Sequence, residues 1–146
     1  MECGILQTSP EELSLYGMEN SHLASMRIRR YALRTDGFVS VNGGFASGEF
    51  TTPPFKFSRE PSKSQPSHLA INFSTSAVGS IQVEMQDADG NPVPGRSISD
   101  CPQIYGDSIE RVVVWNDGPV VREFAGKPIR LRFVIKDADL YAFNFR

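Results

Sequence analysis

Hydrophobic and polar residues alternate along several short stretches of the chain, and this period-two pattern predicts half-buried β-strands. The pattern is clearest in residues 68–73, 80–86 and 129–136. In the second of these, apolar residues such as Ile81 alternate with polar residues such as Glu84. We therefore expect each strand to bury one face and to leave the other face, including Glu84, in solvent.

Six further stretches are expected to form strands, although their alternation is less regular. They are residues 12–16, 25–34, 38–41, 48–51, 109–115 and 140–145. In residues 25–34 the apolar positions change face, which a β-bulge near Arg29 and Arg30 would explain. Residues 112–115 are all apolar, so this stretch is expected to end as a central strand with both faces covered.

Turn-forming residues separate these stretches, and no amphipathic helix of three turns is present. Residues 35–37 and 89–92 have the composition of tight turns. Residues 59–67 are rich in Pro and Ser and are expected to form an exposed, mobile loop. Many short strands at about ten-residue spacing predict an all-β fold, a two-sheet antiparallel β-sandwich of the jelly-roll or concanavalin-like kind.

Length and charge exclude some classes of protein. A chain of 146 residues is long enough to bury one core. Its net charge of −2 argues against a nucleic-acid binder, which usually has a basic surface. No apolar run approaches the roughly 18 residues of a membrane span. The first residues have neither the basic nor the apolar region of a secretory signal.

The chain has one local basic strip despite its net negative charge. Arg27, Arg29, Arg30 and Arg34 surround Tyr31, and interleaved basic and aromatic residues can bind single-stranded nucleic acid. The alternative is a solvated strand face. We favour the solvated face because the rest of the chain shows no further basic patch.

The two cysteines, Cys3 and Cys101, do not make a disulfide framework. Neither has a partner at metal-ligand spacing. We expect both to be free thiols, with a Cys3–Cys101 disulfide in an oxidising compartment as the alternative.

Four aspartates are candidate calcium ligands. Asp87 and Asp89 form one pair near a turn, and Asp137 and Asp139 form another. Calcium prefers hard oxygen donors, but the spacing of an EF-hand loop is absent. The simpler interpretation is that these carboxylates accept hydrogen bonds from turn amides. No other cofactor is indicated by the sequence.

No motif specifies a reaction. A glycosidase needs two carboxylates at a fixed separation, and Glu49, Glu84, Asp87, Asp107 and Glu110 are available. The sequence brings no two of them together, so no catalytic residue is assigned. A small hydrolase that uses Glu49, Glu84 or Asp107 remains one of the hypotheses.

Three aromatic residues are candidates for contact with carbohydrate, because an exposed ring can stack on the apolar face of a sugar. They are Tyr105, Trp115 and Tyr141. Trp115 ends an apolar strand, so burial in the core is its expected fate. Tyr105 lies in a loop-like stretch and is the better candidate for exposure.

A set of short stretches, in a fixed order, resembles a known family. The stretches are residues 34–40, 48–52, 75–77, 79–81, 83–84, 92–95, 100–101, 106–107, 126–133 and 137–143. The last two of them read GKPIRLRF and DADLYAF. The set resembles the C-terminal region of bacterial proteins related to glycoside hydrolase family 32, the sucrose-invertase-like group. In that group a five-bladed propeller holds the active site and a β-sandwich module follows it.

The resemblance covers nearly the whole chain, from about Leu13 to Phe145. It implies that residues 1–24 correspond to the end of a propeller packed on a sandwich domain of residues 25–146. The catalytic carboxylates of the family belong to the propeller, so no position here receives them. The resemblance implies a family with exported members and a non-catalytic accessory module of a carbohydrate-active protein. Its role would be structural or weakly carbohydrate-binding.

The expected partners are a carbohydrate, a propeller domain or a second copy of the chain, with no nucleic acid and no membrane. The alternative function is a protein–protein interaction or homo-oligomerisation domain. It would use a sheet face that a missing propeller leaves bare, because exposed apolar surface tends to find a partner.

Overall fold

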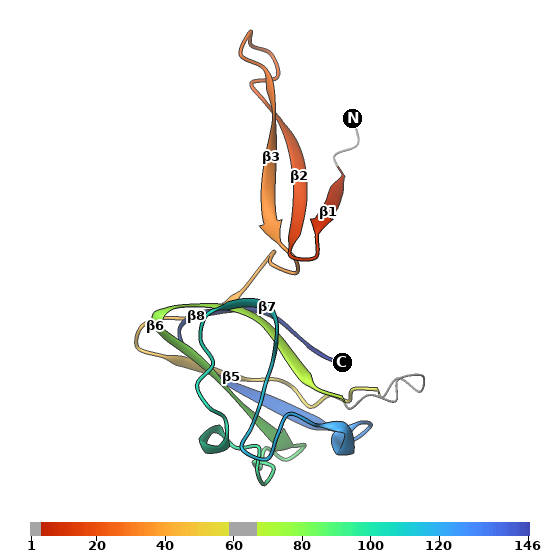
Figure 1. Ribbon diagram of the computed structural model, residues 1–146, viewed down its shortest axis with the longest axis vertical. Coiled ribbons are helices and arrows are strands. Elements are labelled where there is room, and N and C mark those ends of the chain that lie inside the picture. The colour runs from red at the N-terminus through yellow and green to blue at the C-terminus, as the bar shows by residue number, and fades with distance from the viewer. Residues whose placement is uncertain (1–3, 59–66) are drawn as a thin grey trace. The chain divides into compact units, whose positions relative to one another are not determined.

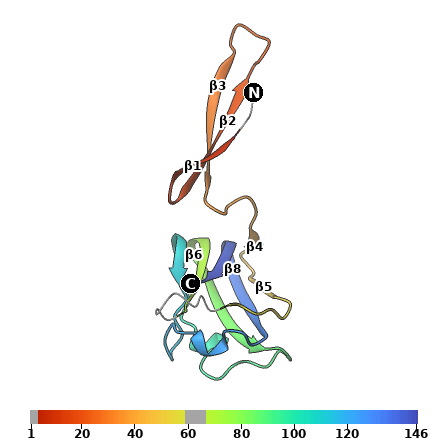
Figure 2. The ribbon, with the colours of Figure 1, turned by 90° about the vertical axis from the view of Figure 1, so that its right-hand side faces the viewer.

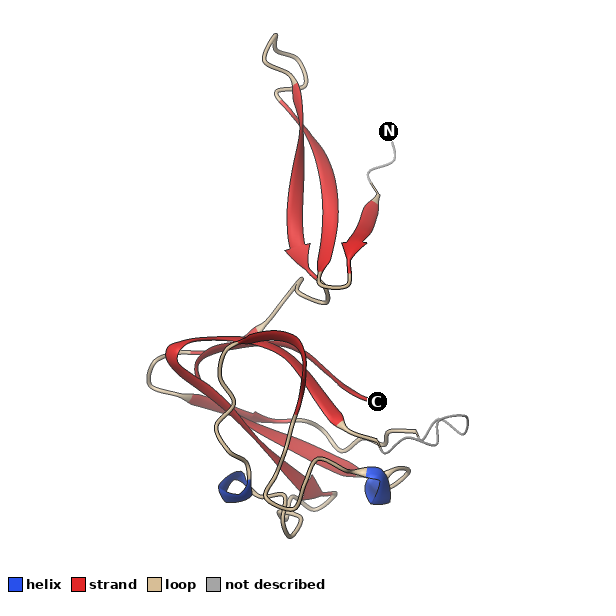
Figure 3. Ribbon diagram, viewed as in Figure 1, coloured by secondary structure: helices blue, strands red, loops and turns tan. Residues whose placement is uncertain are grey.

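The computed structural model describes residues 4–58 and 67–146 of the chain. Its strands are β1 (Ile5–Ser9), β2 (Glu12–Glu19), β3 (Arg27–Arg34), β4 (Val41–Gly43), β5 (Gly48–Thr51), β6 (Leu69–Asp87), β7 (Asp107–Val112) and β8 (Ile129–Phe145). The helical elements among the described residues are the 3₁₀ turns η1 (Ile98–Asp100) and η2 (Arg122–Phe124). Strands dominate the fold (Figure 3), and they form two antiparallel sheets. The predicted all-β, two-sheet antiparallel class is confirmed.

Two predictions concern residues for which little or nothing is described. The loop expected at residues 59–67 lies outside the described residues except for Ser67. Cys3 also lies outside them, whereas Cys101 is a free, buried thiol. No helix in the described part of the chain is both long enough and apolar enough to cross a membrane.

The chain divides into two compact units, Met1–Val39 and Ser40–Arg146. This boundary differs from the one expected between residues 24 and 25. The reason is that β3 pairs along its whole length with β2 and therefore belongs to the first unit.

The first unit is an antiparallel sheet in the order β1-β2-β3 (Figure 1). The register between β2 and β3 runs without a shift from Glu12↔Arg34 to Glu19↔Arg27. The bulge predicted near Arg29 and Arg30 is therefore absent. The apolar positions change face for another reason, because β3 is exposed on both faces for most of its length and neither face has to be uniformly apolar.

Few side chains of the first unit are buried. Among its described residues only Ser14 is in the buried class. Its large apolar side chains are at least 40% exposed at Ile5, Leu6, Tyr16, Met18, Leu23, Met26, Ile28 and Tyr31. A small sheet without an apolar core of its own is at best marginally stable, so cover from elsewhere would stabilise it.

The second unit is built on one long ribbon formed by β6 and β8. The first half of β6 pairs with the second half of β8, from Leu69↔Phe145 to Thr75↔Ala138. The other halves pair from Ser80↔Lys136 to Asp87↔Ile129. Figure 1 shows both strands turning back on themselves within this unit, so the two halves of the ribbon form two layers. The strands predicted at residues 68–73 and 80–86 are thus the two halves of β6.

The bend is located where residues 76–79 of β6 lie opposite the single residue Asp137 of β8. Asp137 has a positive φ of 43°. The two backbones approach closely here, and a Cβ atom at Gly79 would lie 2.2 Å from the Asp137 carbonyl oxygen. Glycine at position 79 therefore permits the bend.

The other strands extend both halves of the ribbon. β4 and β5 pair with different halves of β8, at Val41↔Leu140 and Gly48↔Ile135 (Figure 2). β7 pairs with the first half of β6. The strand expected at residues 38–41 starts only at Val41, and β1 was not predicted.

The core of the second unit lies on the inward faces that alternation predicted. Ile81, Val83 and Met85 are buried on one half of the ribbon. The full cluster contains Phe57, Leu69, Ile71, Phe73, Ile81, Val83, Met85, Cys101, Ile104, Val113, Trp115, Val121, Ile129, Leu131, Phe133, Ile135, Ala138 and Leu140. One core contains residues from both halves of the ribbon, as expected for a β-sandwich.

Candidate functional site: a cleft beside Tyr105

Two segments of the second unit border an open cleft. The first segment follows η1 and is joined to β6 through Ile104. The Ile104 amide donates to the Ile81 carbonyl at 2.9 Å, and the Ile104 carbonyl accepts from the Ile81 amide at 2.8 Å. It ends at Gly106, whose carbonyl accepts from the Thr75 amide at 2.8 Å. The second segment is the end of β7 and the residues after it. Both segments are therefore hydrogen-bonded to β6, the first on both sides of its bend and the second before the bend, where Val113 bonds to Leu69.

The second segment contains the apolar run that predicted a central strand. The amide of Val113 donates to the Leu69 carbonyl at 2.8 Å, and the Val113 side chain is buried. Val112 and Val114 are instead exposed. β7 is at the edge of its sheet rather than in the centre. The prediction of a central strand was wrong because the second apolar face borders a cleft instead of a core.

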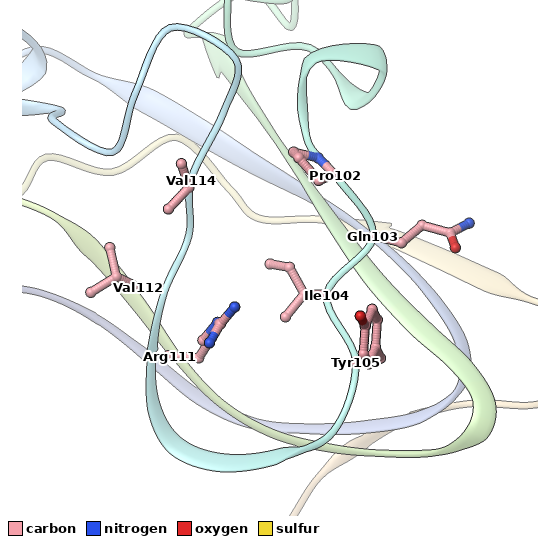
Figure 4. Close-up of a pocket in the computed structure, with 7 residues that line it drawn as sticks. All are labelled: Pro102, Gln103, Ile104, Tyr105, Arg111, Val112 and Val114. Carbon is pink, nitrogen blue, oxygen red and sulfur yellow. The ribbon is translucent and has the colours of Figure 1, made fainter.

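We call this hollow the Tyr105 cleft. It is lined by Pro102, Gln103, Ile104, Tyr105, Arg111, Val112 and Val114 (Figure 4). Its volume is about 370 Å³, near the lower end of the range for ligand pockets. In Figure 4, Ile104 lies between the two segments, with Tyr105 on one side and Arg111 on the other.

The chemistry of the cleft combines an apolar floor with polar groups at its rim. Tyr105 is 77% exposed, so its ring is accessible to a ligand. Arg111 is exposed and contributes the single charge among the lining residues that the structure describes. Neither Tyr105 nor Arg111 makes a side-chain ion pair or hydrogen bond within residues 4–58 and 67–146. The neighbouring Glu110 is paired with Arg146 at 2.5 Å.

The structure does not bring the three candidate aromatic residues together. Trp115 is 1% exposed, and its indole Nε1 donates to the Val83 carbonyl at 2.8 Å. The Arg96 guanidinium lies 5.3 Å from the centre of its ring. Trp115 is thus a core residue, as its apolar neighbours indicated. Its buried ring has no surface for a sugar, so Trp115 is removed from the candidates for carbohydrate contact.

Tyr141 is on β8, and its hydroxyl lies 3.4 Å from the Ser74 Oγ. It is only partly exposed and does not line the Tyr105 cleft. Of the three aromatic candidates, Tyr105 lines the cleft and the other two do not.

Asp87 organises the turn after β6. One of its carboxylate oxygens accepts from the amides of Asp89 and Asn91, each at 2.9 Å, and the other accepts from the Asn91 side chain at 3.0 Å. These hydrogen bonds, first that from the Asn91 side chain, hold the pKa of Asp87 below its usual range. The turn interpretation is confirmed for Asp87.

The second aspartate pair lies elsewhere on the ribbon. Asp139 is opposite Ser74 in the first half of β6, whereas Asp87 is opposite Ile129 at the far end of the second half. The Asp139 Oδ1 accepts from Ser40 at 2.8 Å and from Asn42 at 3.1 Å. The structure therefore separates Asp87 and Asp89 from Asp137 and Asp139. Among the described residues, no three Asp, Glu, His or Cys side chains cluster as a metal site would require.

Two of the candidate carboxylates meet at one arginine. Arg132 lies 2.6 Å from Glu49 and 3.5 Å from Glu84. Glu84 also accepts from Gln86 at 2.8 Å and from the Ile98 amide at 3.1 Å. It is only 4% exposed, so the prediction of a solvated charge was wrong. η1 contacts β6 here, and the amide of Ile98, its first residue, supplies a hydrogen bond that water would otherwise provide.

The basic strip of β3 is largely paired within its own sheet. Arg27 and Arg29 lie 2.8 and 3.0 Å from Glu19, and Arg30 is paired with Glu12. All three arginine side chains keep about half of their surface exposed. This arrangement fits the solvated strand face that we favoured.

Sequence reasoning singled out Tyr105 but missed Arg111 and the two valines. A signal was present, because Arg111 directly precedes a run that is apolar on both faces. An edge strand with a second apolar face indicates a surface hollow, but only the fold shows that β7 is an edge.

Comparisons with protein-family models, with curated proteins and with solved structures find no match for this chain. The resemblance to the sandwich module of family 32 enzymes therefore stays a prediction.

Proposed function

We propose that this chain is a non-catalytic accessory β-sandwich module of a carbohydrate-active, glycoside hydrolase-like protein, and that it binds carbohydrate weakly through the Tyr105 cleft. The observation that carries the proposal is an accessible tyrosine ring across an open hollow with apolar walls from an arginine that makes no ion pair within the described residues. The family resemblance supplies the carbohydrate class.

The cleft has the parts that sugar binding requires. An aromatic ring offers a flat apolar surface, and its hydroxyl and the Arg111 guanidinium offer polar contacts around that surface. The hollow is open and its polar groups are few, so weak affinity is expected, with a dissociation constant on the order of 1 mM.

Calorimetric titration of the whole chain with fructan and other plant or algal oligosaccharides tests the proposal. Tyr105→Ala should weaken binding about tenfold, since aromatic stacking contributes about 0.5–1.5 kcal/mol beyond area burial. Phe45→Ala is the matched control, because Phe45 is 72% exposed and lies outside the cleft. Absence of heat with every saccharide, or equal loss in both variants, would exclude the cleft as the site.

The exposed first unit favours a second candidate function, homo-oligomerisation. The outer edges of β1 and β3 have no strand partner among the described residues. β3 carries four arginines, which would repel one another if two copies paired there, whereas β1 is uncharged. Pairing of β1 with β1 of a second copy is the arrangement that this charge pattern favours.

Light scattering at increasing concentration tests this second candidate. Self-association through β1 predicts a dimer that Leu6→Lys disrupts, because a lysine on an edge strand opposes pairing. Leu23→Lys should leave the dimer intact, since Leu23 is similarly exposed but lies outside the strands. A monomer at every concentration would dispose of the idea.

A further inference from the structure

The charge of the Tyr105 cleft is unbalanced. Among the described residues that line it, Arg111 is the one charged side chain and none is a carboxylate. The Arg111 side chain makes no ion pair or hydrogen bond within the described part of the chain. Elsewhere in the second unit Arg132 and Arg146 are paired with glutamates. A guanidinium in this position is available for an anionic group of a ligand.

The backbone holds Arg111 in this position. It is part of β7 and lies opposite Ile71 of the buried first half of β6. Its neighbour Glu110 is already engaged by Arg146 and does not line the cleft. The positive charge therefore faces a hollow whose other rim is Tyr105 (Figure 4).

We infer that the ligand of the Tyr105 cleft is an acidic saccharide, with one sugar ring on Tyr105 and a carboxylate or sulfate on the Arg111 guanidinium. The inference rests on the proposed carbohydrate function and adds the chemical class of the sugar. Arginine binds planar carboxylates through two parallel hydrogen bonds, and it also binds sulfate-like oxyanions.

Two pairs of ligands, each an acidic saccharide and its neutral counterpart, test the inference. The whole chain is titrated calorimetrically with tetragalacturonate and with its methyl ester, and then with a sulfated galactan tetrasaccharide and its desulfated form. We expect at least one acidic member to bind about tenfold more tightly than its neutral counterpart. Because the contact is ionic, added salt should weaken binding of the acidic ligand and leave binding of the neutral ligand unchanged.

Substitutions assign the preference to Arg111. Arg111→Gln should remove the preference for the acidic ligand, and Arg111→Lys should keep part of it. Arg122→Gln is the matched control, because Arg122 is exposed and lies outside the cleft. Circular dichroism identical to the wild type shows that each variant is folded.

The outcomes separate this inference from the proposed function. Equal, Tyr105-dependent binding of acidic and neutral saccharides would overturn the inference and leave the carbohydrate function standing. An acidic preference that survives in Arg111→Gln would also overturn it. Binding of no saccharide at all would remove both.

Discussion

Glu84 places a charged side chain inside the second unit. Its carboxylate accepts from Gln86 and from the Ile98 amide and lies 3.5 Å from Arg132. A buried carboxylate with these partners is costly to disturb, because each partner would lose an acceptor where water has little access.

We therefore expect Glu84→Ala to lower the free energy of unfolding by about 2–4 kcal/mol. Urea denaturation followed by fluorescence measures the loss. Glu110→Ala, which removes a half-exposed carboxylate of a surface ion pair, should cost less than about 1 kcal/mol. Equal losses in the two variants would contradict the assigned role of Glu84.

Residue-level alternation in the sequence predicts which side chains enter the core but not which polar ones are covered. Ile81 and Val83 point inward as their spacing indicates. Glu84 occupies a polar position of the alternating pattern, as a solvated residue would. Its burial depends on the segment near Ile98, fourteen positions away. Contacts of this kind between distant segments leave no periodic signal.

At the scale of elements, the bend in the long ribbon depends on Gly79. A methyl group there would meet the Asp137 carbonyl oxygen at 2.2 Å, and that atom is backbone that cannot move aside cheaply. Gly79→Ala should therefore cost about 2 kcal/mol or more of stability. Thermal unfolding followed by circular dichroism is the measurement.

Gly48→Ala provides the control for this substitution. Gly48 is in the edge strand β5, and a Cβ atom there would meet no atom within 4 Å. This variant should unfold within a few degrees of the wild type. A Gly79→Ala protein as stable as Gly48→Ala would contradict the close approach at the bend.

The turn after β6 predicts a dependence of stability on pH. Hydrogen bonds, first from the Asn91 side chain, lower the pKa of Asp87 in the folded state. The ionised carboxylate therefore stabilises the fold above its unfolded pKa of about 3.9, and this contribution is lost as the pH falls through the lower folded pKa.

Asp87→Asn replaces the ionised group with a neutral one. The variant should be less stable than the wild type at pH 7, and the gap should close in acid. Urea midpoints measured between pH 7 and pH 2 report the effect. The control is Asp89→Asn, which should show a much smaller gap, because the Asp89 carboxylate accepts no hydrogen bond from the described residues. A gap for Asp87→Asn that is constant with pH would refute the assignment.

Strand elements were more predictable than their connections. Residues 68–73, 80–86 and 129–136 all lie on the β6–β8 ribbon, as their alternation indicates. The joining of the first two into one bent strand was not visible, because residues 76–79 interrupt the pattern as a loop would. β7 was misplaced as central for a related reason, since apolar side chains look alike whether they face a core or a cleft.

At the scale of the whole molecule, the two units differ in how their apolar side chains are used. In the described residues, every buried hydrophobic side chain belongs to the second unit. We therefore expect a fragment of residues 40–146 to unfold cooperatively at nearly the same urea concentration as the full chain. Loss of cooperative unfolding in this fragment would show that the first unit contributes to the core.

The proposed function of the second unit is saccharide binding at the Tyr105 cleft. Its most direct test is a ¹H–¹⁵N correlation spectrum of the whole chain, titrated with tetragalacturonate and its methyl ester. We expect shifts that saturate with at least one of these ligands, confined to residues 103–105 and 111–114. Saturating shifts on another surface, or none with either ligand, would contradict it.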